Sequence, residues 1–254
     1  RGPNSPKSSD ELFALSPDEL RGYLVRWVPQ KDKIGFGPSE EGLGRELSAV
    51  VARDPQRYLQ ETSWYSKLDP TYIRSILQGV AEGLGKGHRF EWEHVLNLSA
   101  WVVAQERTIE GRVVDRWNAD PDWGWTRNTS ANLFAAGFGD NNNSIPLHLR
   151  EKVWSILSVL TEDPNPTAED ERDFNSGHSE GNDIQHAINT VRGKSFETMF
   201  SYALWVRRAI AVAPDAASRL ARGFDNMPEV RAVLDAHLKI DREPSPAIRA
   251  IYGS

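Results

Sequence analysis

The stretch that decides the fold is DPTYIRSILQGVAEGLGKG, residues 69–87. Asp69 has a side chain that can cap a helix, and Pro70 fits the first helical turn because its missing N–H has no partner there anyway. Apolar side chains then recur at helical spacing as far as Leu84, and a pair of glycines that starts at Gly85 ends the pattern. The stretch therefore predicts one helix that begins at Pro70 and ends near Gly85.

The same start signal, a capping or small residue followed by proline, recurs along the chain before other apolar runs. Strict alternation of apolar and polar residues is nowhere sustained, which argues against strands. Helices recur roughly every 15–25 residues, so helix pairs would recur at about 40, nearer to HEAT or armadillo spacing than to TPR spacing. The sequence predicts an all-α fold, an irregular α-solenoid of antiparallel helix pairs (HEAT/armadillo-like). The five further start signals are Ser16-Pro17, Asp54-Pro55, Ile145-Pro146, Ala213-Pro214 and Met227-Pro228.

Composition is that of a folded globular protein. The chain has 254 residues, 39% of them hydrophobic, with nine tryptophans and no cysteine. The absence of cysteine excludes disulfides and thiolate chemistry. No apolar run approaches the roughly 18–20 residues that span a bilayer, and no signal peptide is visible. We therefore expect a cytoplasmic protein that has no membrane partner.

One domain boundary is expected, between residues 8 and 9. Residues 1–8 lack an initiator methionine and read as a flexible linker remnant, and residues 9–254 as a single helical-repeat domain. Residues 245–252 open a new amphipathic helix, and the chain stops about one turn later. We therefore expect a fragment of a larger protein.

The net charge of −6 is concentrated in one segment. Residues 161–183 contain eight acidic side chains and one basic one, so the rest of the chain sums to about +1. We predict an acidic loop over residues 161–182. No basic stripe appears elsewhere, which argues against nucleic acid as a partner.

The best metal-like group of residues is His178, Glu180, Asp183 and His186. Asp183 and His186 are one helical turn apart, so both could face one ion. However, the chain has no HExxH motif, no cysteine ligand and no familiar facial triad. We expect a solvated acidic loop, with no metal and no cofactor. An all-helical metal-dependent enzyme or a small-ligand-binding domain is the alternative.

Residues 117–127 contain three indoles close to carboxylates and an arginine. Such a segment could form a recognition pocket for a peptide, a sugar or a base. The favoured interpretation is that the rings fill the seam between neighbouring helices. Farther along, a long helix is expected from about residue 183 to residue 210. A close helix contact or a kink would explain Gly193, and Arg192 could pair with Glu197 or with a neighbouring helix. The candidate binding residues are Trp117, Trp123, Trp125, Arg127 and Arg192.

Two helix-packing patterns occur in the last third of the chain. They are DIQHAINTVRGKSFE, residues 183–197, and MPEVRAVLD, residues 227–235, with PSPAIRAIYG, residues 244–253. These stretches resemble the helical-repeat regions of large bacterial multidomain ATPases, including the STAND-type proteins associated with anti-phage defence. The resemblance implies repeats that recognise a trigger or hold an assembly, with the ATPase chemistry in a separate domain. It carries over no catalytic residue.

The sequence contains no recognisable catalytic set: no phosphate loop, no nucleophile elbow and no metal motif. We therefore expect a non-catalytic interaction, sensor or scaffold module of a larger protein, and not an enzyme. Its expected partner is a protein, either another domain of the parent chain or a recognised trigger protein.

Overall fold

The computed structural model describes residues 4–29, 37–112, 118–139, 142–177, 187–212 and 214–251. Over these ranges the chain is helical and contains no β-strand, only one isolated bridge between Asn4 and Pro38. The predicted all-α class is confirmed. Every helix in this part of the chain is too short or too polar to span a bilayer.

The chain forms two compact units, whereas the sequence predicts one domain over residues 9–254. Unit 1 comprises Arg1–Gly137 and Asn141–Ser144, and unit 2 comprises Phe138–Asp140 and Ile145–Ser254. The helices of unit 1 are α1 (Ser9–Phe13), α2 (Pro17–Arg26), α3 (Glu40–Val51), α4 (Pro55–Tyr58), α5 (Thr62–Tyr65), α6 (Pro70–Gly85), α7 (Trp92–Ala104) and α8 (Gly124–Gly137).

Local capping places several of these helices where the sequence predicts them. The Ser16 hydroxyl accepts a hydrogen bond from the Glu19 N–H, and the Glu19 carboxylate accepts one from the Ser16 N–H, so α2 begins with a capping box. At α6, the Asp69 carboxylate accepts a hydrogen bond from the Thr71 N–H. Helices α2, α4 and α6 each have proline in the first turn, as expected.

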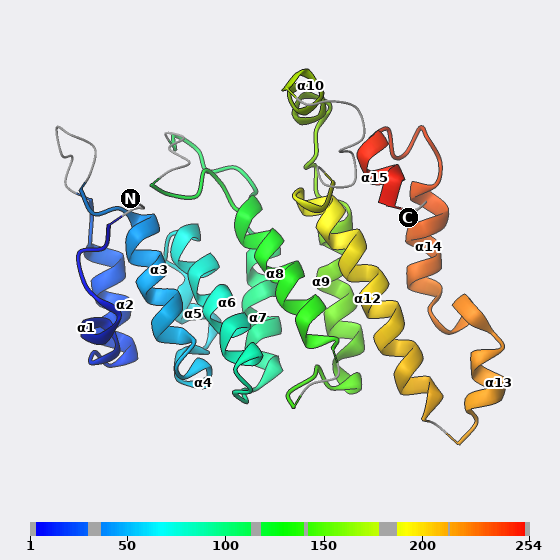
Figure 1. The fold of residues 1–254 in the computed structure, drawn as a ribbon, viewed down its shortest axis with the longest axis horizontal. Helices are drawn as coiled ribbons and strands as arrows, with labels where there is room; N and C mark the ends of the chain where they lie inside the picture. Colours follow the sequence, from blue (N-terminus) through cyan, green and yellow to red (C-terminus); the bar gives the residue numbers. More distant parts are fainter. Residues whose placement is uncertain are drawn as a thin grey trace. The chain divides into compact units, whose positions relative to one another are not determined.

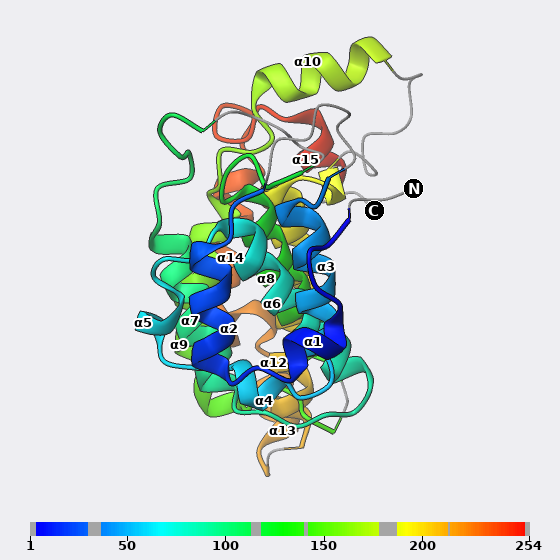
Figure 2. The same cartoon turned by 90° about the vertical axis from the view of Figure 1, so that its left-hand side faces the viewer.

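Helix α6 is the centre of unit 1. It packs against α3 and α8 (Figure 1), and Figure 2 shows α2, α5 and α7 together on one side of the unit and α1 and α3 on the other. Gly79 permits a close approach, because a Cβ there would lie 2.6 Å from both the Ser48 carbonyl oxygen and the Val51 Cβ. The α3 and α6 backbones therefore meet at Gly79 almost without intervening side chains.

Helix α12 is the centre of unit 2 and packs on α9, α13 and α15 (Figure 1). The rings of Phe138, Tyr202 and Trp205 lie in mutual contact, with centroids 5.2–5.7 Å apart. The helices of this unit are η1 (Leu147–Leu149), α9 (Arg150–Thr161), α10 (Ala168–Gly177), α12 (Val191–Ala211), α13 (Ala216–Leu220), η2 (Gly223–Asn226), α14 (Pro228–His237) and α15 (Pro246–Ile251).

The acidic segment is not a continuous loop, because α10 lies inside it. The Thr167 hydroxyl accepts a hydrogen bond from the Asp170 N–H, and the Asp170 carboxylate accepts one from the Thr167 N–H. The first turn also contains Glu169 and Glu171, where negative charge interacts favourably with the helix dipole. Three of the eight acids that suggested a loop thus lie in the first turn of a helix.

The long helix expected from residue 183 to residue 210 is also wrong as a continuous element. Residues 183–186 lie outside the described residues, and α12 begins only at Val191, where the Thr190 hydroxyl caps it by accepting from the Gly193 N–H at 3.1 Å. A Cβ on Gly193 would lie 2.0 Å from the Ala187 carbonyl oxygen. Gly193 therefore lets the preceding segment fold back onto the first turn of α12, and does not mark a kink.

Candidate functional site

The tryptophans of the predicted binding segment are divided between core and surface. Trp117 lies outside the described residues. Trp123 is buried and packs edge-to-face on Trp101, with ring centroids 5.3 Å apart. Trp125 is 39% exposed, and the Arg74 guanidinium carbon lies 5.7 Å from the centre of its ring. Trp123 therefore fills a seam between helices, and Trp125 stays at the surface.

Arg127 and Arg192 hold structural contacts in different units. The Arg127 guanidinium is buried against the C-terminus of α7, where Nη2 donates to the Gln105 carbonyl at 2.8 Å. Arg192 forms an ion pair with Glu243 at 2.9 Å, and Glu197, one of its two expected partners, bonds Lys194 instead. Arg127 and Arg192 thus each stabilise the fold of their own unit, and binding of a partner by the predicted residues stays a prediction.

The metal-like group of His178, Glu180, Asp183 and His186 lies outside the described residues. In the described part of the chain, no group of three or more histidine or acidic side chains is placed to hold a metal ion. The absence of a metal and of a cofactor therefore stays a prediction.

A buried ion cluster in unit 1 joins Glu41, Arg74 and Asp120. The Arg74 Nε lies 3.0 and 2.9 Å from the two oxygens of Asp120, and Nη2 donates to Asp120 Oδ1 at 2.8 Å and to Glu41 Oε2 at 2.5 Å. Burial raises the pKa of Asp120 in spite of the hydrogen bonds and charge of Arg74. The cluster ties the segment before α8 to α3 and α6.

A second cluster, in unit 2, is centred on the buried side chain of His237 and extends to the surface. Its Nδ1 lies 3.0 Å from Glu243 Oε2, and its Nε2 lies 3.0 Å from Glu162 Oε1. The hydrogen bond with Glu243 raises the pKa of His237, burial opposes that shift, and Glu162 adds to it. Arg192 and Arg242 pair with the same carboxylates. These mutual contacts fasten α14 and the segment after it to α9.

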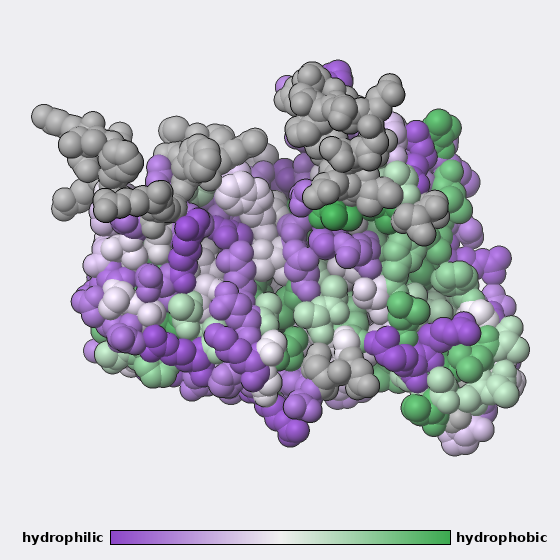
Figure 3. All heavy atoms as spheres, viewed as in Figure 1, coloured by the Kyte–Doolittle hydropathy of each residue, from purple (hydrophilic) through white to green (hydrophobic). Residues whose placement is uncertain are grey.

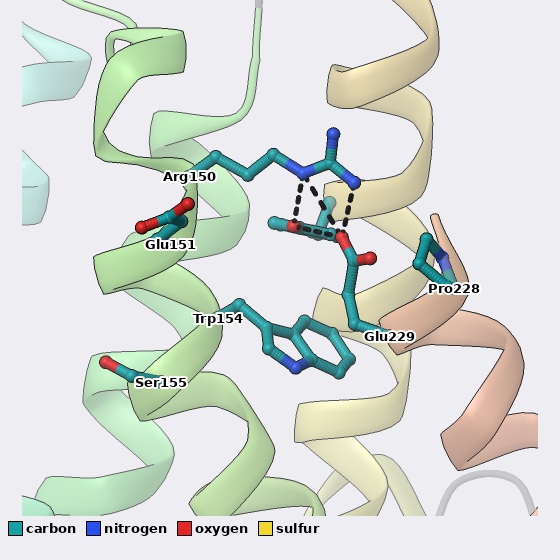
Figure 4. Close-up of a pocket in the computed structure, with 7 residues that line it drawn as sticks. Arg150, Glu151, Trp154, Ser155, Pro228 and Glu229 are labelled. Carbon is teal, nitrogen blue, oxygen red and sulfur yellow. Dashed lines mark hydrogen bonds and ion pairs between the residues drawn. The ribbon is translucent and has the colours of Figure 1, made fainter. Parts of the chain in front are cut away.

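An open pocket of about 430 Å³ lies between α9, α12 and α14 (Figure 4). None of the residues expected to bind a partner lines it. Figure 4 shows Arg150 reaching from α9 toward Glu229 on α14, with the indole of Trp154 below this pair. The lining residues are Arg150, Glu151, Trp154, Ser155, Tyr202, Pro228 and Glu229.

Hydrogen bonds hold one edge of the pocket. Arg150 Nε lies 3.1 Å from both the Tyr202 hydroxyl and Glu229 Oε1, and Arg150 Nη2 lies 2.5 Å from the same Glu229 oxygen. The Tyr202 hydroxyl donates to Glu229 Oε1 at 2.7 Å. Nη2 also donates to the Asn226 carbonyl at 2.7 Å. Three helices of unit 2 thus meet at a single carboxylate oxygen.

The protonation states at this edge are fixed around neutral pH. Burial raises the pKa of Glu229, but the hydrogen bonds from Arg150 and Tyr202 outweigh it, so the net pKa lies below the usual range. Burial and the Glu229 carboxylate raise the pKa of Tyr202. Around neutral pH, Glu229 is therefore ionised and Tyr202 neutral.

Trp154 forms the aromatic wall of the pocket. Its ring centroid lies 5.3 Å from that of Tyr202, and the ring is only half-buried. From the sequence, Trp154 is one more apolar residue on a helix stripe, and nothing links it to residues 48 or 75 positions away. The helical pattern of α9 predicts its side of the helix but not its partners.

Comparison of the chain with protein-family models, curated proteins and solved structures finds no match.

Proposed function

We propose that this chain is a non-catalytic protein-interaction module, and that unit 2 binds its partner through the pocket between α9, α12 and α14. The observation that carries the proposal is the combination of Trp154, Tyr202 and Arg150 around one open cavity. Tryptophan, tyrosine and arginine are the side chains most enriched among residues that dominate binding energy at protein interfaces. The fixed ion pair beside them provides a polar rim.

The apolar surface of unit 2 supports the same proposal. Its exposed large apolar side chains include Val212, which is 87% exposed, together with Leu204, Leu238 and Ile240. Figure 3 shows hydrophobic surface where α12 ends and α13 lies. Exposed apolar surface such as that where α12 ends is typical of interaction sites.

We also propose that the helices belong to an irregular HEAT- or armadillo-like repeat of a larger multidomain protein, as the resemblance to STAND-type ATPases implies. The packing of α3, α6 and α8 in succession supports this proposal within unit 1. In such an arrangement, the partner of unit 2 is another domain of the parent chain or a protein trigger.

The pocket is tested by selecting binders from a random-peptide phage library against the immobilised chain and measuring their affinity by fluorescence anisotropy. Trp154→Ala is expected to weaken the selected peptides at least about tenfold, because it removes the aromatic wall. Val159→Ala, which changes another exposed apolar residue of α9, serves as the control and should leave affinity unchanged. Circular dichroism checks that both variants fold.

Peptides that bind wild type and Trp154→Ala equally would place the interaction elsewhere. A library that yields no specific binder would count against an interaction module of this kind.

A further inference from the structure

We propose that the pocket between α9, α12 and α14 accepts a lysine or arginine side chain of the protein partner. This inference rests on the proposed function and adds the chemical class of the occupant. The charge of the lining residues is its first support. The lining contains one basic side chain, Arg150, and two acidic ones, Glu151 and Glu229, so the pocket carries one net negative charge.

Arg150 is already engaged, so its charge is not available to a ligand. Its Nε and Nη2 both bond Glu229 Oε1, and Nη2 also donates to the Asn226 carbonyl. The hydrogen bonds drawn at Glu229 in Figure 4 all end on that one oxygen, and the second carboxylate oxygen points away from Arg150. The Glu229 carboxylate also accepts a hydrogen bond from its own backbone N–H, but that bond supplies no cation. The second oxygen and the exposed carboxylate of Glu151 can therefore still meet a cation.

Trp154 favours a cation for an independent reason. The face of an indole carries negative electrostatic potential, so it attracts an ammonium or guanidinium group and repels an anion. The aliphatic stem of lysine or arginine can lie along the indole and Pro228, leaving the charged head at the carboxylates. A volume of about 430 Å³ is ample for either side chain.

An acidic occupant fits the same geometry poorly. The remaining guanidinium nitrogen of Arg150 points away from Trp154 in Figure 4. An anion bound there would leave the aromatic wall uncovered. The charge balance and the aromatic face thus both favour a basic side chain.

The experiment titrates the ¹⁵N-labelled chain with three small probes and follows the Trp154 indole N–H and the α14 backbone amides by NMR. The probes are N-acetyl-lysinamide, its uncharged counterpart N-acetyl-norleucinamide, and the amide of N-acetyl-glutamic acid. We expect lysinamide to saturate these signals at the lowest concentration, norleucinamide to bind more weakly and the glutamic acid derivative not to saturate them.

Two variants separate charge from shape. Glu151→Gln is expected to weaken lysinamide by about 1.5- to 5-fold, the range of an exposed charge pair, and to leave norleucinamide unchanged. Asp235→Asn removes an exposed acid of α14 outside the pocket and serves as the matched control. Trp154→Leu keeps an apolar wall without an aromatic face, so it should reduce the preference for lysinamide over norleucinamide in the α14 signals, with the part due to the carboxylates remaining.

Equal binding of lysinamide and norleucinamide would overturn the basic occupant and leave the pocket as an apolar anchor site. Stronger binding of the glutamic acid derivative would also overturn it, in favour of an acidic partner. If no probe moves the pocket signals, the basic occupant and the pocket itself as the binding site are both wrong.

Discussion

Replacing Asp120 with alanine should strongly destabilise unit 1, because it leaves the charge of Arg74 buried without its main partner. Asp120 is 0% exposed and receives three hydrogen bonds from Arg74. Removing one partner of a buried ion pair typically costs about 3–5 kcal/mol of unfolding free energy. Since Glu41 still contacts Arg74 at 2.5 Å, we expect a loss near the lower end, about 3 kcal/mol.

The same unit contains a matched control in the pair between Asp10 and Arg53. The two charges are 2.7 Å apart, as close as in the buried pair, but the Asp10 side chain is 85% exposed. Exposed pairs contribute only about 0–1 kcal/mol. Asp10→Ala should therefore leave the stability of unit 1 nearly unchanged, and the contrast isolates the effect of burial from that of distance.

The assay is thermal and urea unfolding followed by circular dichroism and tryptophan fluorescence. A loss of about 3 kcal/mol corresponds to a fall in Tm of roughly 6–12 °C, at about 2–4 °C per kcal/mol for a unit of this size. Asp120→Asn keeps the shape of the side chain and removes its charge, which is already disfavoured because burial raises the pKa of Asp120. This substitution should therefore cost less unfolding free energy than Asp120→Ala. If Asp120→Ala and Asp10→Ala shift Tm equally, burial does not set the strength of the pair.

Further changes test other contacts. The folded structure raises the pKa of His237 above its unfolded value of about 6.5. The resulting stability is fully present below about pH 6.5 and is lost as pH rises through the folded pKa. The Tm of wild type should therefore fall between neutral and alkaline pH by an amount that His237→Gln does not show. Gly79→Ala should destabilise by about 1–3 kcal/mol because its Cβ meets the α3 backbone. Gly85→Ala, with open space around it, should stabilise by about 0.4–1 kcal/mol in urea unfolding. Trp123→Ala should cost about 3–5 kcal/mol in the same measurement, since the ring is buried, and Trp125→Ala much less.

The sequence by itself determined the helical class and the starts of several helices. The capping box of Ser16 and Glu19 and the cap at Asp69 join residues two or three positions apart. Such bonds form within one turn of the chain, so the residues that make them can be read in a short window. The hydrogen bond by which Thr190 caps α12 is also local. It was missed because the apolar stripe continues through this position and suggests one uninterrupted helix.

Only the tertiary structure decided what the helices bring together. Arg150 meets Tyr202 and Glu229, which are 52 and 79 positions away, and Asp120 meets Arg74 across 46 positions. Likewise, the tertiary structure buries Trp123 and leaves Trp125 at the surface, although the two residues are neighbours in one segment. Periodicity shows which face of a helix is apolar, but which helix covers that face depends on packing between elements. That choice is made by contacts that no local window of sequence contains.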